Sequence, residues 1–219
     1  MTALELDYDD EVAGSPDRAV LLAHGAGSDR QSAALVAVAA SLRLAGIPSL
    51  RFDYPYRSAG RRSPDRAPVL EAATRSAVVE LTSRTGLPAE RVVLGGRSMG
   101  GRYCSFIVGA TEEPVSALGL VLLAYPLHPA GRQEERRVAH FPLLRLPVLF
   151  VSGDRDALGA RKELEEAAVA IPGSVTFHWI EGADHAYRVP RRLGRSSEEV
   201  LTEVAEVTSR WVGSLSPPV

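Results

Sequence analysis

The amino-acid sequence predicts a three-layer α/β fold in which a mostly parallel central sheet of about seven strands carries helices on both faces. Short runs rich in β-branched residues alternate with longer amphipathic segments along almost the whole chain. Most of these runs are apolar without interruption, as strands buried on both faces are. The length of 219 residues suits one domain. We expect that domain to span residues 1–214, with a frayed tail at 215–219.

Seven short runs predict strands, because each is apolar and is bounded by turn-forming residues or by the start of a helical pattern. Two of them, RVVLGG and PVLFVSG, lead directly into polar residues that could carry chemistry. The predicted strands comprise residues 4–8, 19–24, 49–54, 91–96, 118–125, 147–153 and 175–180.

The amphipathic segments between these runs predict helices. Residues 32–46 and 68–86 each close on a glycine, the residue expected just past a helix C-terminus. The last helix opens with Ser196 and Glu199 in the spacing of a capping box. Further helices are expected at 99–110 and at 161–171, a surface loop at 56–68, and an insertion or short helix at 128–142.

Composition excludes several classes of function. The formal net charge is −2, so no strong positive field favours nucleic acid or an anionic membrane surface. Lys162 is the only lysine, and arginine does not readily lose its proton to act as a base. Cys104 is the only cysteine, so neither an internal disulfide nor a thiolate metal site is expected. We expect no metal and no cofactor.

The chain also shows no feature of export. Its N-terminal segment is acidic and lacks a basic start followed by an apolar core. No stretch reaches the roughly 18 apolar residues that a membrane-spanning helix needs. We therefore expect a cytoplasmic protein.

Ser98 lies in the stretch VVLGGRSMGGR, between Gly96 and Gly100. The pattern Gly-x-Ser-x-Gly can arise by chance, and a simple turn at a strand end is the alternative interpretation. Its context favours a functional role, because a sharp turn from a buried strand into a helix exposes the side chain at its apex and requires small neighbours. We predict that Ser98 is a nucleophile at the carboxyl edge of the sheet, where ligands of open α/β sheets bind.

A serine nucleophile needs a base, and the base needs an orienting acid, each in a loop after a later strand. His185 follows the strand at 175–180 and is the predicted base. Asp154 and Asp156 both follow the strand at 147–153. We predict Asp156 as the acid, because its position leaves the chain room to curl toward the histidine loop. Asp154 is expected to bind backbone N–H groups of the turn.

The other histidines have expected roles outside the chemistry. His24 ends an early strand and is expected to form local hydrogen bonds beside an oxyanion loop. His178 lies within a strand pattern and is expected to be an ordinary core or surface residue. His128 and His140 belong to the 128–142 segment, where solvent-exposed or loop-stabilising roles are expected.

Attack on an acyl carbon places negative charge on oxygen, which preorganised N–H donors stabilise. The backbone N–H of Met99, the residue after the nucleophile, is one predicted donor. The stretch HGAG, residues 24–27, can supply the second, and Ala26 is the predicted residue. A plain glycine turn is the alternative interpretation of HGAG.

The stretches HGAG, GGRSMGG, GDRD and GADH occur in the order, and at the strand ends, typical of the α/β-hydrolase superfamily, which the chain resembles over nearly its full length. The resemblance implies the α/β-hydrolase fold with Ser98, Asp156 and His185 as catalytic residues and the amides of Ala26 and Met99 as the oxyanion hole. FDYPYR and YPLHPAG narrow the resemblance to a small dienelactone-hydrolase-related branch that includes testis-expressed protein thirty and a chromatin-complex subunit. Dienelactone hydrolase itself uses a cysteine nucleophile, whereas here Cys104 is expected to be a small core residue.

The predicted function is hydrolysis of a small soluble carboxylic ester. Only some 20 residues separate the strands at 118–125 and 147–153, so no large cap domain is expected and the site is expected to be open. An acyltransferase or peptidase would use the same residues, and a scaffold that merely retains them stays an alternative.

Candidate substrate contacts are Arg97, Arg102 and Tyr54. Arginines crowd the predicted rim of the site, and bidentate binding of a carboxylate would explain that placement. A chain that uses arginine for almost all of its positive charge would also scatter arginines over every surface. The sequence predicts neither the oligomeric state nor a partner protein.

Overall fold

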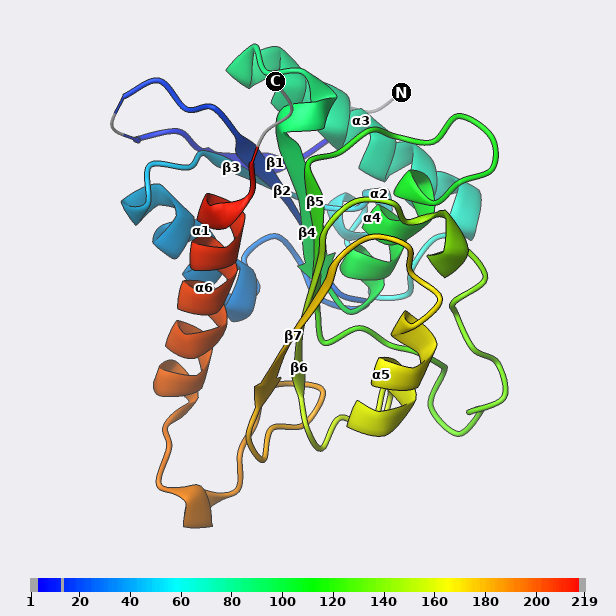
Figure 1. The fold of residues 1–219 in the computed structure, drawn as a ribbon. Coiled ribbons are helices and arrows are strands. Elements are labelled where there is room, and N and C mark those ends of the chain that lie inside the picture. The colour runs from blue at the N-terminus through cyan, green and yellow to red at the C-terminus, as the bar shows by residue number, and fades with distance from the viewer. Residues whose placement is uncertain (1–3, 13, 217–219) are drawn as a thin grey trace.

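A computed structural model describes residues 4–12 and 14–216 (Figure 1). Its strands form one seven-stranded sheet in the order β1-β3-β2-β4-β5-β6-β7. β1 pairs antiparallel with β3, and all other neighbours are parallel. The predicted α/β class is therefore confirmed. The strands are β1 (Leu6–Asp9), β2 (Ala19–Ala23), β3 (Ser49–Phe52), β4 (Val92–Arg97), β5 (Gly119–Leu123), β6 (Val148–Gly153) and β7 (Val175–Ile180).

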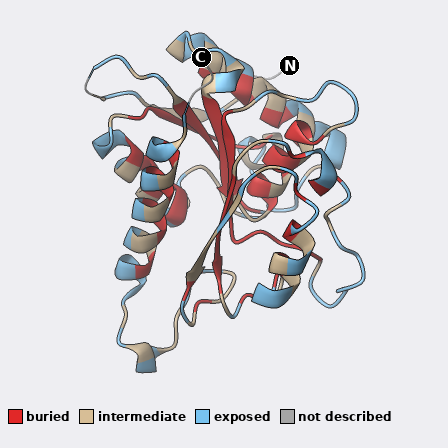
Figure 2. Ribbon diagram, in the orientation of Figure 1, coloured by how far each residue is buried: buried red, intermediate tan, exposed pale blue. Residues whose placement is uncertain are grey.

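The helices lie in two layers on opposite faces of this sheet (Figure 1). One layer contains α1 (Ala33–Leu44) and α6 (Ser197–Ser214), and the other contains α3 (Ala67–Thr85), α4 (Met99–Val108) and α5 (Arg161–Ala168). Figure 2 shows the central strands buried between the layers, and every residue of β2, β3, β5 and β6 is buried. Uninterrupted apolar runs in the sequence therefore correspond to strands covered on both faces.

The start of α6 follows its predicted capping box. The hydroxyl of Ser196 accepts a hydrogen bond from the Glu199 N–H at 3.1 Å, and the Glu199 carboxylate accepts one from the Ser196 N–H at 2.6 Å. These bonds satisfy two backbone N–H groups at the helix end. The buried side of α6 includes Val200 and Val204.

One segment differs from expectation. The predicted loop at 56–68 overlaps a short helix, α2 (Pro55–Ser58), which begins at a proline whose fixed φ suits the first helical position. The segment 128–142 is an insertion, one of its two expected forms, and contains no α-helix, only the start of a 3-10 turn at Phe141–Leu143. Residues 217–219 of the predicted tail lie outside the described residues, so the domain bounds stay a prediction. No helix in the described part of the chain is long and apolar enough to span a membrane.

The strand order places a topological switch point at β2 and β4, at the carboxyl edge of the sheet. β2 lies between β3 and β4, so the chain leaves β3 and crosses β2 through α3 before it enters β4. The loops after β2 and β4 consequently lead to opposite faces, into α1 and α4. Ligands of open α/β sheets bind at such a point, and both HGAG and Ser98 lie there.

Candidate active site

Ser98 occupies the apex of the turn between β4 and α4. Its backbone has φ 52° and ψ −115°, a conformation that residues with a side chain rarely adopt. The Ser98 N–H donates to the carbonyl oxygen of Leu123 in β5 at 2.8 Å, which ties the turn to the next strand. The side chain is partly exposed, while the flanking Met99 and Gly100 are buried. The turn thus presents the hydroxyl at the carboxyl edge of the sheet.

The glycines around Ser98 are needed because β2 approaches the turn closely. A Cβ on Gly96 would lie 2.3 Å from the carbonyl oxygen of Ala23, and a Cβ on Gly100 would lie 2.1 Å from the same oxygen. Neither atom fits there. The pattern around Ser98 is thus a packing requirement between β2 and the β4–α4 turn.

The structure brings Ser98, His185 and Asp156 into one hydrogen-bonded chain. Nε2 of His185 is 2.9 Å from Oγ of Ser98, and Nδ1 of His185 is 2.7 Å from Oδ2 of Asp156. An ionised carboxylate only accepts hydrogen bonds, so Nδ1 carries the hydrogen and Nε2 is free to accept from the serine hydroxyl. The side chain of Asp156 is fully buried and that of His185 is 25% exposed. The imidazole therefore lies between a carboxylate that is shielded from solvent and the protein surface.

The two aspartates after β6 have different partners. Oδ1 of Asp156 accepts from the Leu158 N–H at 2.8 Å, while Oδ2 accepts from His185. Asp154 does not bind His185; its Oδ1 accepts from the Gly182 N–H at 2.8 Å. Asp154 thus binds a backbone N–H, as expected, and joins the loops after β6 and β7.

Several contacts fix the loop that carries His185. Oδ1 of Asp184 accepts from the N–H groups of Ala186 and Arg188, at 2.8 and 2.9 Å. The hydroxyl of buried Tyr187 donates to the Val151 carbonyl at 2.7 Å. Arg97, next to Ser98, donates from Nη2 to the carbonyl oxygen of His185 at 2.8 Å. The nucleophile turn and the histidine loop are therefore joined directly.

This contact changes the interpretation of Arg97. The sequence predicts it as a substrate contact, but one guanidinium nitrogen is occupied by the His185 carbonyl. The side chain also borders the HGAG loop, since a Cβ on Gly25 would lie 3.4 Å from Nη1 of Arg97. Nothing in the sequence indicates this pairing, because the partner atom is a backbone oxygen 88 residues away.

The HGAG loop lies beside the serine. A Cβ built on Gly25 would be 3.6 Å from the Cβ of Ser98. The Gly27 N–H donates to the hydroxyl of Tyr56 at 3.2 Å, so that amide is occupied. The amides of Ala26 and Met99 have no acceptor among the described residues. Tyr56, which the sequence did not single out, thus occupies the Gly27 amide and leaves the Ala26 amide available.

His24 holds the same loop from behind. Its Nε2 accepts from the Tyr54 N–H at 3.1 Å, and its Nδ1 donates to the Gly25 carbonyl at 2.8 Å. Burial, the largest cause, lowers the pKa of His24, so the imidazole stays neutral in this arrangement. The expected local role of His24 fits these contacts.

Tyr54 does not fit its predicted role as a substrate contact. Its side chain is completely buried, and its hydroxyl is 3.1 Å from Oγ1 of Thr74. The ring packs edge-on against His24, with ring centroids 5.0 Å apart. Tyr54 therefore supports the HGAG loop from the core.

The 128–142 segment contains two histidines that are buried, which corrects the expectation of solvent exposure. Nε2 of His140 lies 2.8 Å from Oγ of Ser105, and Nδ1 of His128 lies 2.9 Å from the Pro129 carbonyl. Their loop-stabilising role fits these contacts. His178 in β7 is partly buried and lies 2.7 Å from Glu203, also outside the site.

Cys104 is buried in the core with its thiol 3.3 Å from the Gly95 carbonyl. Burial raises its pKa to about 12, which leaves it protonated and unreactive at neutral pH. Among residues 4–12 and 14–216, no cluster of histidine, cysteine or acidic side chains has the arrangement of a metal site.

Residues 16–213 match the family described as "Alpha/beta hydrolase domain". The chain therefore belongs to the α/β hydrolases, and this membership supports a hydrolase. Its resemblance to the dienelactone-hydrolase-like branch is confirmed at the level of the fold, because dienelactone hydrolase from Anabaena variabilis superposes with a TM-score of 0.74. That pair is 22% identical and covers 97% of this chain and 92% of the other.

Two further solved structures have the same fold. Est1E from Butyrivibrio proteoclasticus, determined with bound ferulic acid, has a TM-score of 0.71 at 16% identity, with 96% of each chain covered. An α/β serine hydrolase without a lid from Xanthomonas campestris has a TM-score of 0.66 at 17% identity, covering 95% of this chain and 89% of the other. At these identities the likeness concerns the fold alone.

Proposed function

We propose that the protein is a serine hydrolase that cleaves small soluble carboxylic esters through an acyl-serine intermediate. The observation that carries the proposal is the chain of hydrogen bonds from Ser98 through His185 to Asp156, at 2.9 and 2.7 Å. A serine hydroxyl attacks efficiently only when a base takes its proton and a third group orients that base. These three side chains come from three separate loops.

The proposed reaction begins with attack of Oγ of Ser98 on the ester carbonyl carbon, while Nε2 of His185 takes the hydroxyl proton. The carbonyl π electrons move onto oxygen, where the N–H groups of Ala26 and Met99 stabilise the charge. Collapse of this intermediate breaks the bond to the alkoxy oxygen, which receives the proton from His185. In the second half of the reaction, water gives a proton to Nε2 of His185 and attacks the acyl carbon. The bond to Oγ of Ser98 then breaks, Oγ takes the proton from His185, and the carboxylic acid is released. Asp156 keeps Nδ1 protonated throughout and stabilises the imidazolium.

The absence of a cap favours small substrates. Between β5 and β6 the chain forms an irregular loop with one 3-10 turn, and no additional layer forms there. An open site gives a long acyl chain little apolar surface to bury, so chain length adds little affinity. We include a cytoplasmic location in this proposal, since the lone cysteine is a buried free thiol.

Hydrolysis of p-nitrophenyl acetate, butyrate and palmitate tests this function. We expect kcat/KM to be higher for the two short esters than for palmitate. Asp156→Asn should lower kcat by about 10³- to 10⁴-fold, because it disturbs the tautomer of the base. Asp154→Asn is the matched control and should retain most of the activity. A strong preference for palmitate, or equal activity of the two variants, would contradict the proposal.

A further inference from the structure

Strand β1 forms one edge of the sheet and leaves part of its backbone unpaired. The Asp53 N–H donates to the Glu5 carbonyl at 2.8 Å, so Glu5 and every second residue after it direct their backbone groups toward β3. Alternate residues of an antiparallel strand direct these groups to opposite sides. The N–H and C=O groups of Leu6 and Tyr8 therefore point away from β3. No other described residue bonds to these four groups.

A groove with a volume of about 700 Å³ lies beside this edge, between β1 and α3. Leu4 and Leu6 form one wall, because their side chains pack toward the α3 layer. The charged residues of the groove, Glu80 and Arg84, bond to each other at 2.7 Å. The surface that remains for a ligand is therefore mainly apolar. The other lining residues are Pro55, Pro68, Val69, Ala72, Ala73 and Ser76.

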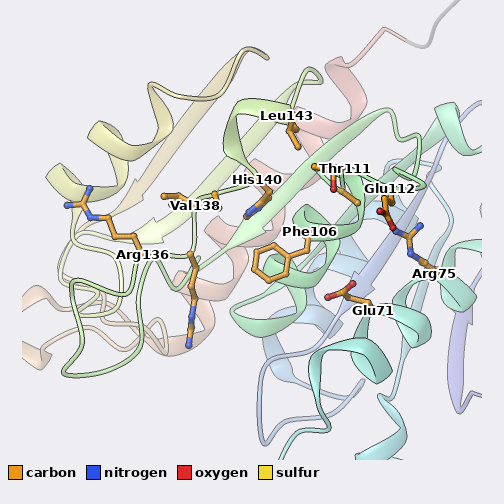
Figure 3. A pocket seen from close by; sticks show the side chains of 13 residues that line it. Glu71, Arg75, Phe106, Thr111, Glu112, Arg136, Val138, His140 and Leu143 are labelled. Atoms are coloured by element: carbon orange, nitrogen blue, oxygen red, sulfur yellow. The ribbon is translucent and has the colours of Figure 1, made fainter.

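The groove between α3 and α4 has a different character. Figure 3 shows Arg75 and Glu112 on one side of the Phe106 ring and Arg136 on the other. Charges of both signs favour no single class of ligand. Arg102, the remaining predicted substrate contact, lines neither groove; its guanidinium lies 5.5 Å from the centre of the Phe106 ring, and its role stays a prediction. The groove beside β1 is thus the one that joins apolar surface to unpaired backbone groups.

The opposite face of β1 is acidic. Asp7 and Asp9 lie on this face, because successive side chains of a strand alternate between its two faces. Asp10 and Glu11 follow at exposed positions and form no ion pair among the described residues. The edge therefore carries an excess of negative charge, although four carboxylates here share two guanidinium groups. The carboxylates are those of Glu5, Asp7, Asp9 and Asp53, and the guanidinium groups are those of Arg30 and Arg51.

The charge on this edge disfavours a second copy of the chain as its partner. Two β1 strands related by a two-fold axis would bond to each other through the free groups of Leu6 and Tyr8. The antiparallel register that pairs Leu6 with Tyr8 sets Asp7 opposite its own copy. A shift of two residues in either direction sets Asp7 opposite Glu5 or Asp9. Like charges directly opposite one another destabilise a strand pair, so the edge suits a basic partner.

We propose that the edge of β1 binds an extended segment of a partner protein in which apolar and basic residues alternate. The segment adds an eighth strand to the sheet by bonding to the backbone of Leu6 and Tyr8. Every second side chain then enters the groove beside α3, and the side chains between them meet the acidic face. Backbone bonds provide affinity in such strand addition, and the side chains provide specificity. No residue of the proposed catalytic site takes part, so the inference does not depend on the proposed function.

Fluorescence anisotropy with the labelled peptide Val-Lys-Leu-Arg-Val-Lys-Leu tests this surface. We expect saturable binding to the parent that weakens as NaCl is added, because salt screens the attraction between exposed charges. An analogue with glutamate in place of each lysine and arginine should bind about tenfold more weakly or worse, since like charges then face one another. Equal binding of the two peptides would overturn the proposed chemistry of the partner.

Methylation of the peptide backbone tests strand addition itself. N-methyl groups on one alternate set of residues should abolish binding, because these N–H groups face β1. N-methyl groups on the other set should leave binding nearly unchanged, because those N–H groups face solvent. Equal effects of the two sets would contradict the addition of a strand.

Two arginine substitutions on α3 locate the binding surface. Ala72→Arg should weaken peptide binding about tenfold or more, because it places a long cationic side chain in the groove. Val79→Arg adds the same charge at an exposed position of the same helix outside the groove, and it should bind like the parent. Equal binding by the two variants, or no saturable binding to the parent, would overturn the site. Sedimentation that shows a parent dimer, dissociated by Ala72→Arg, would assign the edge to a second copy and would also overturn it.

Discussion

At the scale of single residues, the glycines beside Ser98 are determined by the neighbouring strand. Gly96 and Gly100 both lie against the carbonyl oxygen of Ala23, which is also the strand partner of Gly96. Any side chain at either position would push β2 away from the β4–α4 turn. The same strand leads into the loop of Ala26, so the separation of the two strands sets the distance between the nucleophile and the proposed oxyanion donor.

Replacing a glycine by alanine should therefore change the free energy of unfolding in opposite directions at Gly100 and at Gly213. Gly100→Ala should lower the free energy of unfolding by about 1–3 kcal/mol, because its Cβ overpacks against Ala23. Gly213→Ala, in α6 with no atom within 4 Å of the added Cβ, should raise it by about 0.5–1 kcal/mol. Urea unfolding measures both values. Equal effects of the two substitutions would show that contact with Ala23 does not explain Gly100.

At the scale of elements, Arg97 connects the nucleophile turn to the loop after β7. Its guanidinium bonds the backbone of His185 itself, so it controls where the imidazole lies relative to Ser98. Asp184 and Tyr187 shape the same loop from within. We regard Arg97 as a positioning residue, because it acts through His185.

Arg97→Met should lower kcat on a neutral short ester about tenfold and leave KM nearly unchanged, because it removes a charge-assisted hydrogen bond. Arg97→Lys should recover part of the loss, since it keeps a charged donor. Arg155→Met, at an exposed position in the neighbouring loop, is the control. Steady-state kinetics with p-nitrophenyl butyrate separates kcat from KM. A change confined to KM would instead favour the direct substrate contact that the sequence suggests.

The elements themselves could be predicted because their determinants are local. The uninterrupted apolar runs at 19–24 and 147–153 became buried strands, and the capping box at Ser196 begins α6. Asp156 was separable from Asp154 by its distance from the strand end. The contact of Arg97 with His185 was not predictable, because it joins loops 88 residues apart. The burial of His140 also depends on how the 128–142 loop folds over α4, where its Nε2 meets Oγ of Ser105.

At the scale of the whole molecule, burial of His140 links stability to pH. Burial and then the charge of Arg102 lower its pKa from 6.5 to about 4. The unfolded chain therefore takes up a proton below pH 6.5, and the folded protein does not until pH approaches 4. The contribution of His140 to stability is present above pH 6.5 and is lost as pH falls toward 4.

As pH falls from 7 to 5, the difference in protonation of His140 between the folded and unfolded states should reduce the free energy of unfolding by about 2 kcal/mol. His140→Gln should show a pH dependence smaller by that amount, since it retains a hydrogen-bonding side chain beside Ser105 without the titration. Urea unfolding at the two pH values gives the comparison. Identical losses in the parent and the variant would mean that His140 is protonated equally in the folded and unfolded states.

The fold as a whole brings together Ser98, Asp156 and His185, which lie far apart in the sequence. The central claim is that these contacts make Ser98 a nucleophile. The most direct measurement is intact-mass analysis and peptide mapping after reaction with a fluorophosphonate, which phosphonylates only an activated serine. We predict one adduct per chain, mapped to Ser98, and no adduct in Ser98→Ala. A folded parent that takes up no probe, or takes it up at another residue, would contradict the claim and favour a protein that binds without catalysis.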